Sequence, residues 1–123
     1  MIKKEVLIVD DSNTNNFLLQ SILEGEGIHT SIAFSGQEAF DYLNTEKPAL
    51  ILLDIVMPHI DGFSVLKQLR EAPETQHIPV VFITAKNEEQ LKEKAIDAGA
   101  TDLILKPIDV KKVLEVVKKI LIN

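Results

Sequence analysis

Five short β-rich runs, each followed by a stretch with helical spacing, constrain the fold of this chain more than any other feature. Several runs are almost continuously apolar, such as VLIV, LILL and VVFI, which is typical of strands buried on both faces of a parallel sheet. A (βα)5 alternation predicts right-handed crossovers and helices on both faces of the sheet. Eight barrel units do not fit into 123 residues, so we expect an open α/β sheet. The predicted strands are Glu5–Val9, His29–Phe34, Leu50–Leu53, Pro79–Ile83 and Asp102–Leu105.

The stretches that follow the strands carry apolar side chains at helical spacing. The last one is the clearest, because its apolar residues form one stripe and Asp109 precedes it as an N-cap. The fourth has only Leu91, Ala95 and Ile96 as apolar anchors, so we expect it to be the most loosely held. The predicted helices are Thr14–Glu24, Gly36–Thr45 (burying Ala39, Phe40 and Leu43), a third after Asp61 and Gly62 (burying Val65, Leu66 and Leu69), Asn87–Ala98, and a fifth with Val110, Val113, Leu114, Val117, Ile120 and Leu121 on its stripe.

The length of the chain indicates one domain over residues 1–123. Its charge and hydropathy limit the kinds of partner that it can bind. No apolar run approaches the ~20 residues of a membrane-spanning helix. Lys3 and Lys4 precede an apolar stretch that is too short for a secretion signal, so we expect no membrane contact and a cytoplasmic location. The net charge of −6 argues against direct binding to nucleic acid. The chain has no Cys, which excludes disulfides and zinc thiolates.

Polar side chains follow four of the five predicted strands. In open α/β sheets, ligands bind beyond the carboxyl ends of the strands, where the strand order reverses. The second strand ends without an ionisable residue, so the edge is polar only where the other four meet. These residues are Asp10 and Asp11 after the first strand, Asp54 after the third, Thr84 and Ala85 after the fourth, and Lys106 and Pro107 after the fifth.

The mutual repulsion of three carboxylates at one edge of a sheet must be compensated by positive charge or by protonation. Two carboxylates about 4 Å apart repel by roughly 4 kcal/mol at an effective dielectric constant of 20, and one lysine cannot offset three such pairs. Either a proton is retained or a cation is bound. A few hard oxygen ligands with room for water suit Mg²⁺ better than zinc or calcium. A metal beside an ammonium and a hydroxyl is also the set of groups that phosphoryl transfer uses.

Four motifs in order make the chain resemble the receiver domain of the two-component response regulators, over essentially all 123 residues. They are LIVDDS at Leu7–Ser12, LLDIVMPHIDG at Leu52–Gly62, FITA at Phe82–Ala85 and LKP at Leu105–Pro107. The resemblance implies a flavodoxin-like (βα)5 domain with strand order 2-1-3-4-5. It also implies a phosphorylation-dependent signalling switch.

The resemblance assigns roles at the polar edge. Asp54 resembles the phosphoacceptor, and Asp10 and Asp11 resemble the acidic pair. With Asp54 and the backbone carbonyl of Val56, that pair would hold Mg²⁺. Lys106 resembles the lysine that binds the phosphoryl oxygens, through a cis peptide bond to the following proline.

Two further positions concern the switch itself. Thr84 resembles the hydroxyl residue that moves toward the phosphoryl group, and Ala85 the small neighbour that leaves room for it. Family members often carry an aromatic ring three residues before the lysine, where this chain has Leu103. The aromatic half of the usual switch is therefore missing. We expect the output surface to comprise the fourth helix, the fifth strand and the fifth helix.

The implied phosphoryl donor is a histidine on a sensor histidine kinase or a histidine phosphotransfer protein. The domain would not be an enzyme in its own right, since it would assist only its own phosphorylation and dephosphorylation. His29, His59 and His77 lack metal-ligand spacing and are interpreted as surface or loop residues. The downstream effector, a phosphorylation-dependent dimer, and the choice between a free-standing domain and part of a longer protein stay open.

Other interpretations remain to be tested. Taken singly, the Asp pair could cap the first helix, Asp54 could belong to a turn with Asp61, and Lys106 could be a solvated lysine. A second function is a receiver-like adaptor that binds partners without phosphorylation. A third is a small hydrolase of the haloacid-dehalogenase type. Such an enzyme needs Asp-x-Asp after the first strand, and Ser12 stands at the third position.

Overall fold

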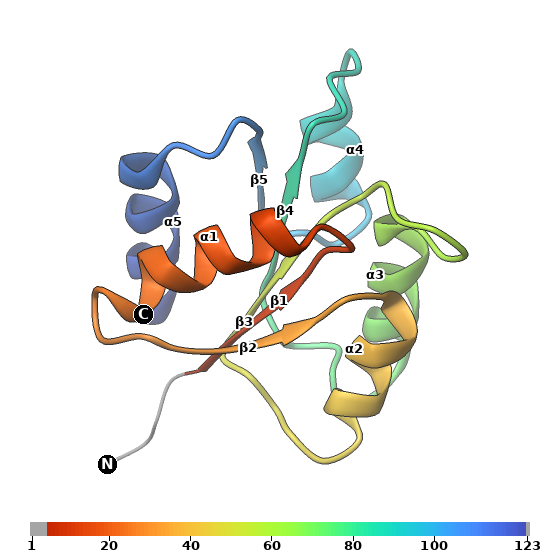
Figure 1. Cartoon of the computed structure of the whole chain (residues 1–123). Helices are drawn as coiled ribbons and strands as arrows, with labels where there is room; N and C mark the ends of the chain where they lie inside the picture. The colour runs from red at the N-terminus through yellow and green to blue at the C-terminus, as the bar shows by residue number, and fades with distance from the viewer. Residues whose placement is uncertain (1–4, 123) are drawn as a thin grey trace.

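A computed structural model of the chain describes residues 5–122. They form a five-stranded parallel sheet in the order β2-β1-β3-β4-β5, with helices on both faces (Figure 1). The predicted fold class and strand order are confirmed. Residues 1–4 and 123, which include Lys3 and Lys4, lie outside the described residues. The elements are β1 (Glu5–Val9), α1 (Asn13–Glu24), β2 (His29–Ala33), α2 (Gly36–Leu43), β3 (Leu50–Leu53), α3 (Gly62–Glu71), β4 (Val80–Thr84), α4 (Leu91–Asp97), β5 (Asp102–Leu105) and α5 (Val110–Ile122).

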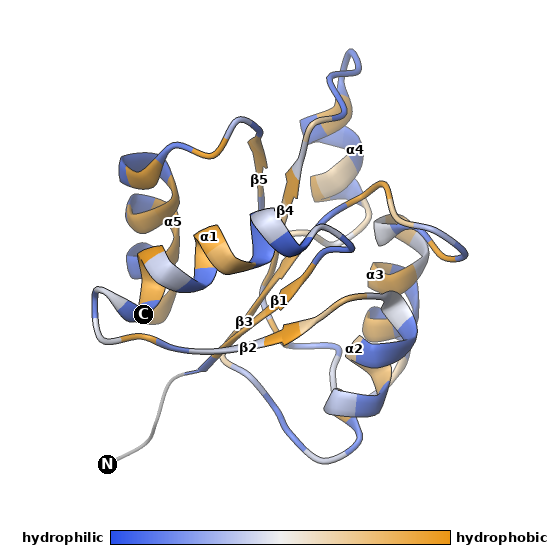
Figure 2. Cartoon of the chain, viewed as in Figure 1, coloured by the Kyte–Doolittle hydropathy of each residue, from blue (hydrophilic) through white to orange (hydrophobic). Residues whose placement is uncertain are grey.

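Two apolar layers hold the sheet between its helices. On one face α1 and α5 pack Leu23 and Val117 against strand residues such as Ile8 (Figure 1). On the other face α2, α3 and α4 pack around Leu53 and Phe82. Figure 2 shows that apolar residues dominate the strands, whereas the helices carry both apolar and hydrophilic residues. β3 and β4 are buried along their whole length, which explains their continuous apolar runs.

Two strands differ by one residue from the prediction. β2 ends at Ala33, because the N–H of Phe34 donates to Oε1 of Glu38 at 2.9 Å instead of pairing in the sheet. Glu38 in turn donates its N–H to Oγ of Ser35 at 3.1 Å, a reciprocal capping arrangement at the start of α2. β4 begins at Val80 rather than at Pro79 and extends to Thr84, since proline has no N–H to contribute to a ladder.

The second and fourth helices are shorter than predicted. α2 ends at Leu43, because the N–H of Thr45 bonds to the carbonyl of Tyr42 three residues back and tightens the last turn. Its Phe40 is only partly buried. α4 begins at Leu91, since Gln90 adopts a left-handed conformation with φ of 62°. The predicted anchor Ile96 is wrong, as this side chain is 44% exposed.

The fifth helix follows its prediction with one correction. Its first turn is capped by Asp109, whose Oδ1 accepts the N–H of Lys112 at 3.2 Å. The predicted stripe residue Val110 is 51% exposed, and Val116 is buried instead. Val110 is the first residue of the helix and is exposed, whereas Val116 belongs to the same core cluster as Val117. The third helix buries Val65, Leu66 and Leu69, as predicted.

Candidate functional site

The carboxyl ends of β1 and β3 bring two buried carboxylates together. Asp10 follows β1 and Asp54 follows β3, and these strands are neighbours in which Val9 pairs with Leu53. The N–H of Asp54 donates to the carbonyl of Val9 at 2.9 Å, which continues the ladder past the strand end. Asp10 is 3% exposed and Asp54 is 7% exposed. Buried charges of this kind require partners.

An ammonium group from the end of β5 contacts both carboxylates. Lys106 donates through Nζ to Oδ2 of Asp10 at 2.9 Å and to Oδ2 of Asp54 at 3.3 Å. Its N–H donates to the carbonyl of Thr84 at 2.8 Å, and the Lys106–Pro107 peptide is cis, as the resemblance implied. The interpretation of Lys106 as a solvated lysine is wrong, since its side chain is only 14% exposed.

Burial and neighbouring charges shift two ionisation equilibria in this cluster. Burial raises the pKa of Asp54, and the negative charge of Asp10 raises it further, while Lys106 offsets only part of the shift. Burial lowers the pKa of Lys106, but the hydrogen bond to Asp10 and the charge of Asp54 outweigh it, so that pKa lies above its usual value. Lys106 therefore stays cationic at neutral pH, whereas the surroundings of Asp54 disfavour its ionised form, which a second cation would stabilise.

Asp11 adds a third carboxylate on the solvent side of the cluster. Asp10, Asp11 and Asp54 each offer an oxygen, and these oxygens lie within 4.8 Å of one another. The N–H of Val56 lies 3.4 Å from Oδ1 of Asp54, which places the Val56 backbone beside the same carboxylate. Hard oxygen ligands at this spacing, with an exposed side left for water, fit a Mg²⁺ ion. Burial and the charge of Asp10 raise the pKa of Asp54 more than Lys106 lowers it.

The structure places the predicted switch residues beside this cluster rather than inside it. Thr84 is fully buried at the end of β4, and its hydroxyl accepts the N–H of Lys86 at 3.1 Å. Ala85 is exposed. Among residues 5–122 the Thr84 hydroxyl has no hydrogen bond to Asp54. Leu103 is 9% exposed and belongs to the same core cluster as Phe82.

Sequence reasoning missed two residues at the start of α1. Ser12 is the N-cap, because its Oγ accepts the N–H of Asn15 at 3.3 Å. Neither aspartate of the Asp10–Asp11 pair therefore caps this helix. Asn16 is fully buried and donates through Nδ2 to the carbonyl of Asp10 at 2.7 Å. A serine before a helix is a recognised capping signal that could have identified Ser12, but nothing in the sequence marks Asn16.

A third missed feature is the close approach of Gly62 to the loop that follows Asp54. A Cβ atom at Gly62 would lie 2.4 Å from the carbonyl oxygen of Asp54 and 2.8 Å from Cα of Ile55. The N–H of Gly62 donates to the carbonyl of Ile55 at 2.7 Å. Asp61 caps α3 by accepting the N–H of Ser64 at 2.9 Å. The bond from Gly62 to Ile55 therefore closes the loop between Asp54 and Asp61. The two aspartates differ in their partners, since Asp61 caps α3 and Asp54 contacts Lys106.

Other kinds of site are not supported by the described residues. His29, His59 and His77 are exposed, as predicted, and none joins a metal-ligating group within residues 5–122. No helix in this part of the chain has the length and apolar character needed to cross a membrane.

The comparison that decides the family is a match to a sequence model. The model for the response regulator receiver domain covers residues 6–118. The chain belongs to the response regulator receiver domain family. Receiver domains of this family take part in phosphorylation-based signalling, as the resemblance implied.

Relatives of this receiver domain include both long and short proteins. It is 40% identical to the response regulator PleD of Caulobacter vibrioides, over 85% of this chain and 23% of that protein. It is 40% identical to the alkaline phosphatase synthesis transcriptional regulatory protein PhoP of Bacillus subtilis, over 98% of this chain and 49% of PhoP. The chain thus spans half or less of these two relatives. Protein PilH of Pseudomonas aeruginosa is 37% identical over 94% of this chain and 96% of PilH.

Solved structures agree with this assignment. A two-component response regulator from Clostridium difficile superposes with a TM-score of 0.90 at 31% identity, covering 98% of this chain and 97% of the other. A response regulator from Thermotoga maritima gives a TM-score of 0.88 at 30% identity, covering 99% and 100%. The receiver fold is therefore shared along nearly the whole length of the chain.

Proposed function

We propose that this receiver domain accepts a phosphoryl group on Asp54 from a phosphohistidine of a sensor histidine kinase or a histidine phosphotransfer protein. Membership of the family supports phosphorylation-based signalling. The observation that carries the finer proposal is the position of the Asp54 carboxylate, buried against Lys106 and within 4.8 Å of oxygens from Asp10 and Asp11. In-line phosphoryl transfer requires an attacking oxygen with positive charge on either side of it. Here Lys106 supplies one charge, and the oxygens of Asp10 and Asp11 would hold the other as Mg²⁺.

In the proposed reaction an Asp54 carboxylate oxygen attacks phosphorus, and the bond between phosphorus and the histidine nitrogen breaks. Asp10, Asp11, Asp54 and the Val56 carbonyl would hold Mg²⁺, which supplies positive charge next to the transferring oxygens. Lys106, whose raised pKa keeps it protonated, donates to a phosphoryl oxygen once Asp54 is modified. Water attack on the acyl phosphate later restores the carboxylate.

The response begins with Thr84 and Lys106. Acyl phosphate adds roughly 1.5–2 negative charges, by analogy with other phosphorylated side chains. Thr84 would exchange its bond from Lys86 for one to a phosphoryl oxygen, and the small side chain of Ala85 leaves room for this movement. Leu103 has no aromatic ring, and its side chain is already buried. Position 103 therefore does not supply the inward ring movement of the usual switch. The switch of this domain then rests on Thr84 and on the loosely capped α4.

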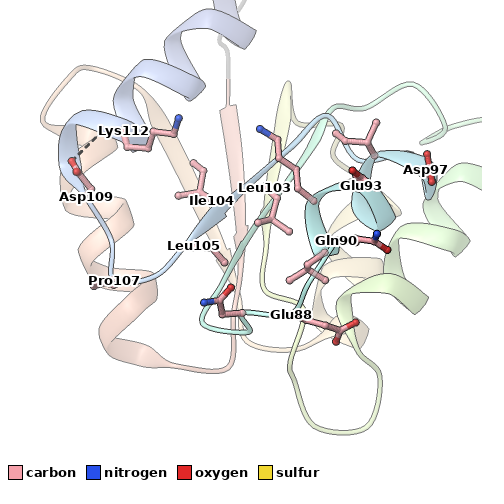
Figure 3. Close-up of a pocket in the computed structure, with 14 residues that line it drawn as sticks. Glu88, Gln90, Glu93, Asp97, Leu103, Ile104, Leu105, Pro107, Asp109 and Lys112 are labelled. Atoms are coloured by element: carbon pink, nitrogen blue, oxygen red, sulfur yellow. Dashed lines mark hydrogen bonds between the residues drawn. The ribbon is translucent and has the colours of Figure 1, made fainter.

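The proposed output surface is a groove between α4, β5 and α5, with a volume of about 1080 Å³. Figure 3 shows Leu103 and Leu105 of β5 projecting between α4 and the start of α5, with Glu88 and Glu93 near its rim. Because one wall is α4, a shift of that helix changes the shape of the groove. An effector, or a second copy of the domain after phosphorylation, would bind here.

The names of relatives that are transcriptional regulators support a cytoplasmic location.

The direct test is incubation of the protein with acetyl phosphate and Mg²⁺, followed by Phos-tag electrophoresis. The wild type should give a retarded band, and Asp54→Asn should give none while remaining folded. Asp61→Asn is the matched control, because it removes an exposed carboxylate seven positions away and keeps a good capping residue. A wild type without a retarded band would support the adaptor interpretation. Equal labelling of the Asp54→Asn variant would overturn the choice of Asp54.

A further inference from the structure

Asn16 is a fully buried polar residue that the proposed chemistry does not use. It lies in the first turn of α1 and is 0% exposed. Its Nδ2 donates to the backbone carbonyl of Asp10 at 2.7 Å. Its Oδ1 is buried and has no hydrogen-bond partner among residues 5–122. A buried polar atom without a partner destabilises the folded state. The cost of burying Oδ1 raises the question of what the bond from Nδ2 to Asp10 contributes.

The single bond of Asn16 is one of four hydrogen bonds that hold Asp10, whose own N–H donates to the carbonyl of Ala33 at 3.2 Å. The Asp10 carbonyl accepts from Asn16, Oδ1 accepts the N–H of Ser12 at 2.9 Å, and Oδ2 accepts Nζ of Lys106 at 2.9 Å. The last two bonds set the direction of the carboxylate. The first fixes the peptide group between Asp10 and Asp11, from which both carboxylates project.

A purely structural role for Asn16 explains less. α1 is already anchored to the sheet by Leu19 and Leu23, which are almost fully buried, and its first turn is capped by Ser12. A leucine at position 16 would keep the branched shape of asparagine, although its methyl groups are larger, and would bury no unpartnered oxygen. The amide contributes one thing that leucine lacks, which is the donor to the Asp10 carbonyl.

We propose that Asn16 is a positioning residue, which holds the Asp10–Asp11 peptide so that both carboxylates face a divalent cation. The inference rests on the proposed function. Asn16 itself is not a proposed metal ligand, and the inference predicts effects on metal binding in the absence of any phosphoryl donor.

The test compares Asn16→Leu with wild type by calorimetric titration with Mg²⁺. We expect the dissociation constant to rise about tenfold, which corresponds to about 1.4 kcal/mol. Without metal, the amide of Ser12 should exchange with solvent several-fold faster by NMR, because its acceptor on Asp10 is less well oriented. With acetyl phosphate, the half-saturating Mg²⁺ concentration should rise, while the rate at saturating Mg²⁺ stays within about twofold. Asn16→Ala, which only trims the side chain, should show the same changes if the leucine variant folds poorly.

Thr75→Val is the matched control. Thr75 is also buried, and its hydroxyl donates to the carbonyl of Leu69 at 2.8 Å near the end of α3, which is remote from the acidic cluster. This variant should lose stability yet bind Mg²⁺ as the wild type does. Equal Mg²⁺ affinity in folded Asn16 variants and wild type would overturn the inference alone. A wild type that binds no Mg²⁺ would instead count against the proposed function.

Discussion

Nζ of Lys106 lies 2.9 Å from Oδ2 of Asp10, although 96 positions separate the two residues in the chain. The bond connects β5 at one edge of the sheet to β1 near its centre, across β4 and β3. It also leaves Nζ within 3.3 Å of Asp54. One ammonium therefore contacts two buried carboxylates and compensates them only in part.

Replacing Lys106 with methionine should lower the stability of the metal-free protein. Methionine keeps most of the side-chain volume, but Asp10 and Asp54 lose their shared donor while remaining buried. We expect the free energy of unfolding at pH 7 to fall by about 1–3 kcal/mol, as measured by urea denaturation. Lys111→Met, at an exposed position of α5, is the control and should change it by less than about 0.5 kcal/mol. Equal losses in both variants would contradict the shared-donor interpretation.

The raised pKa of Asp54 predicts a pH-dependent stability difference between Asp54→Asn and the wild type. A carboxyl whose pKa is higher in the folded state than in the unfolded state destabilises the fold when ionised. This penalty is present at pH above the folded pKa and is relieved as the pH falls through it. The gain in unfolding free energy on substitution should therefore be larger at pH 7 than at pH 4 in metal-free buffer.

Urea denaturation of both proteins at several pH values measures this difference, with Asp61→Asn as the control for loss of one surface charge. Added Mg²⁺ should stabilise the wild type at pH 7 more than Asp54→Asn, because binding to the folded state is linked to stability. A difference that is constant with pH would show that Asp54 has an ordinary pKa.

Much of this arrangement could be predicted from the sequence, for a physical reason. Strands such as LILL identify themselves by continuous apolar character, and a parallel sheet brings their carboxyl ends to one edge, so Asp10, Asp54 and Lys106 could be placed together without coordinates. The start of α4 could not be predicted, because residues 87–90 include good helix formers. In the structure Glu88 instead forms an ion pair with Lys86, and the backbone of Gln90 adopts a left-handed conformation. Asn16 was also beyond sequence reasoning, since its partner is a backbone carbonyl.

Gly62→Ala should destabilise the protein through contact with backbone. The added Cβ would meet the carbonyl oxygen of Asp54 at 2.4 Å and Cε1 of Phe82 at 2.9 Å. The first of these atoms cannot move without displacing the backbone of Asp54, the proposed phosphoacceptor. We expect a loss of about 1–3 kcal/mol in unfolding free energy, together with slower labelling by acetyl phosphate. Gly25→Ala, where φ is −60° and the nearest atom lies at 3.2 Å, is the control. Wild-type stability in Gly62→Ala would show that the loop relaxes freely.

Arg70 fixes the carboxyl end of α4, which determines where that helix can move. Nε and Nη2 of Arg70 donate to the carbonyl of Gly99 at 3.1 and 2.9 Å, joining α3 to the turn after α4. At the amino end, Gln90 makes no side-chain capping bond among the described residues. Lys92 forms an ion pair with Asp102 of β5 at 3.4 Å, but the lysine side chain is 67% exposed, and exposed ion pairs contribute little to stability. Motion of α4 should therefore be largest at its amino end, which borders the groove proposed as the output surface.

Arg70→Met removes these donors and keeps the apolar part of the side chain. We expect a loss of about 1 kcal/mol in unfolding free energy and faster hydrogen exchange in α4 and in residues 99–101, with α1 and α5 unchanged. Lys67→Met, at an exposed position of the same helix, should alter neither. Exchange that accelerates equally in α1, α4 and α5 would indicate global destabilisation and would contradict a local anchor. In the wild type, exchange should already be faster at Leu91 and Lys92 than at Asp97, because two hydrogen bonds from Arg70 hold the carboxyl end of α4, whereas the ion pair of Lys92 is largely exposed.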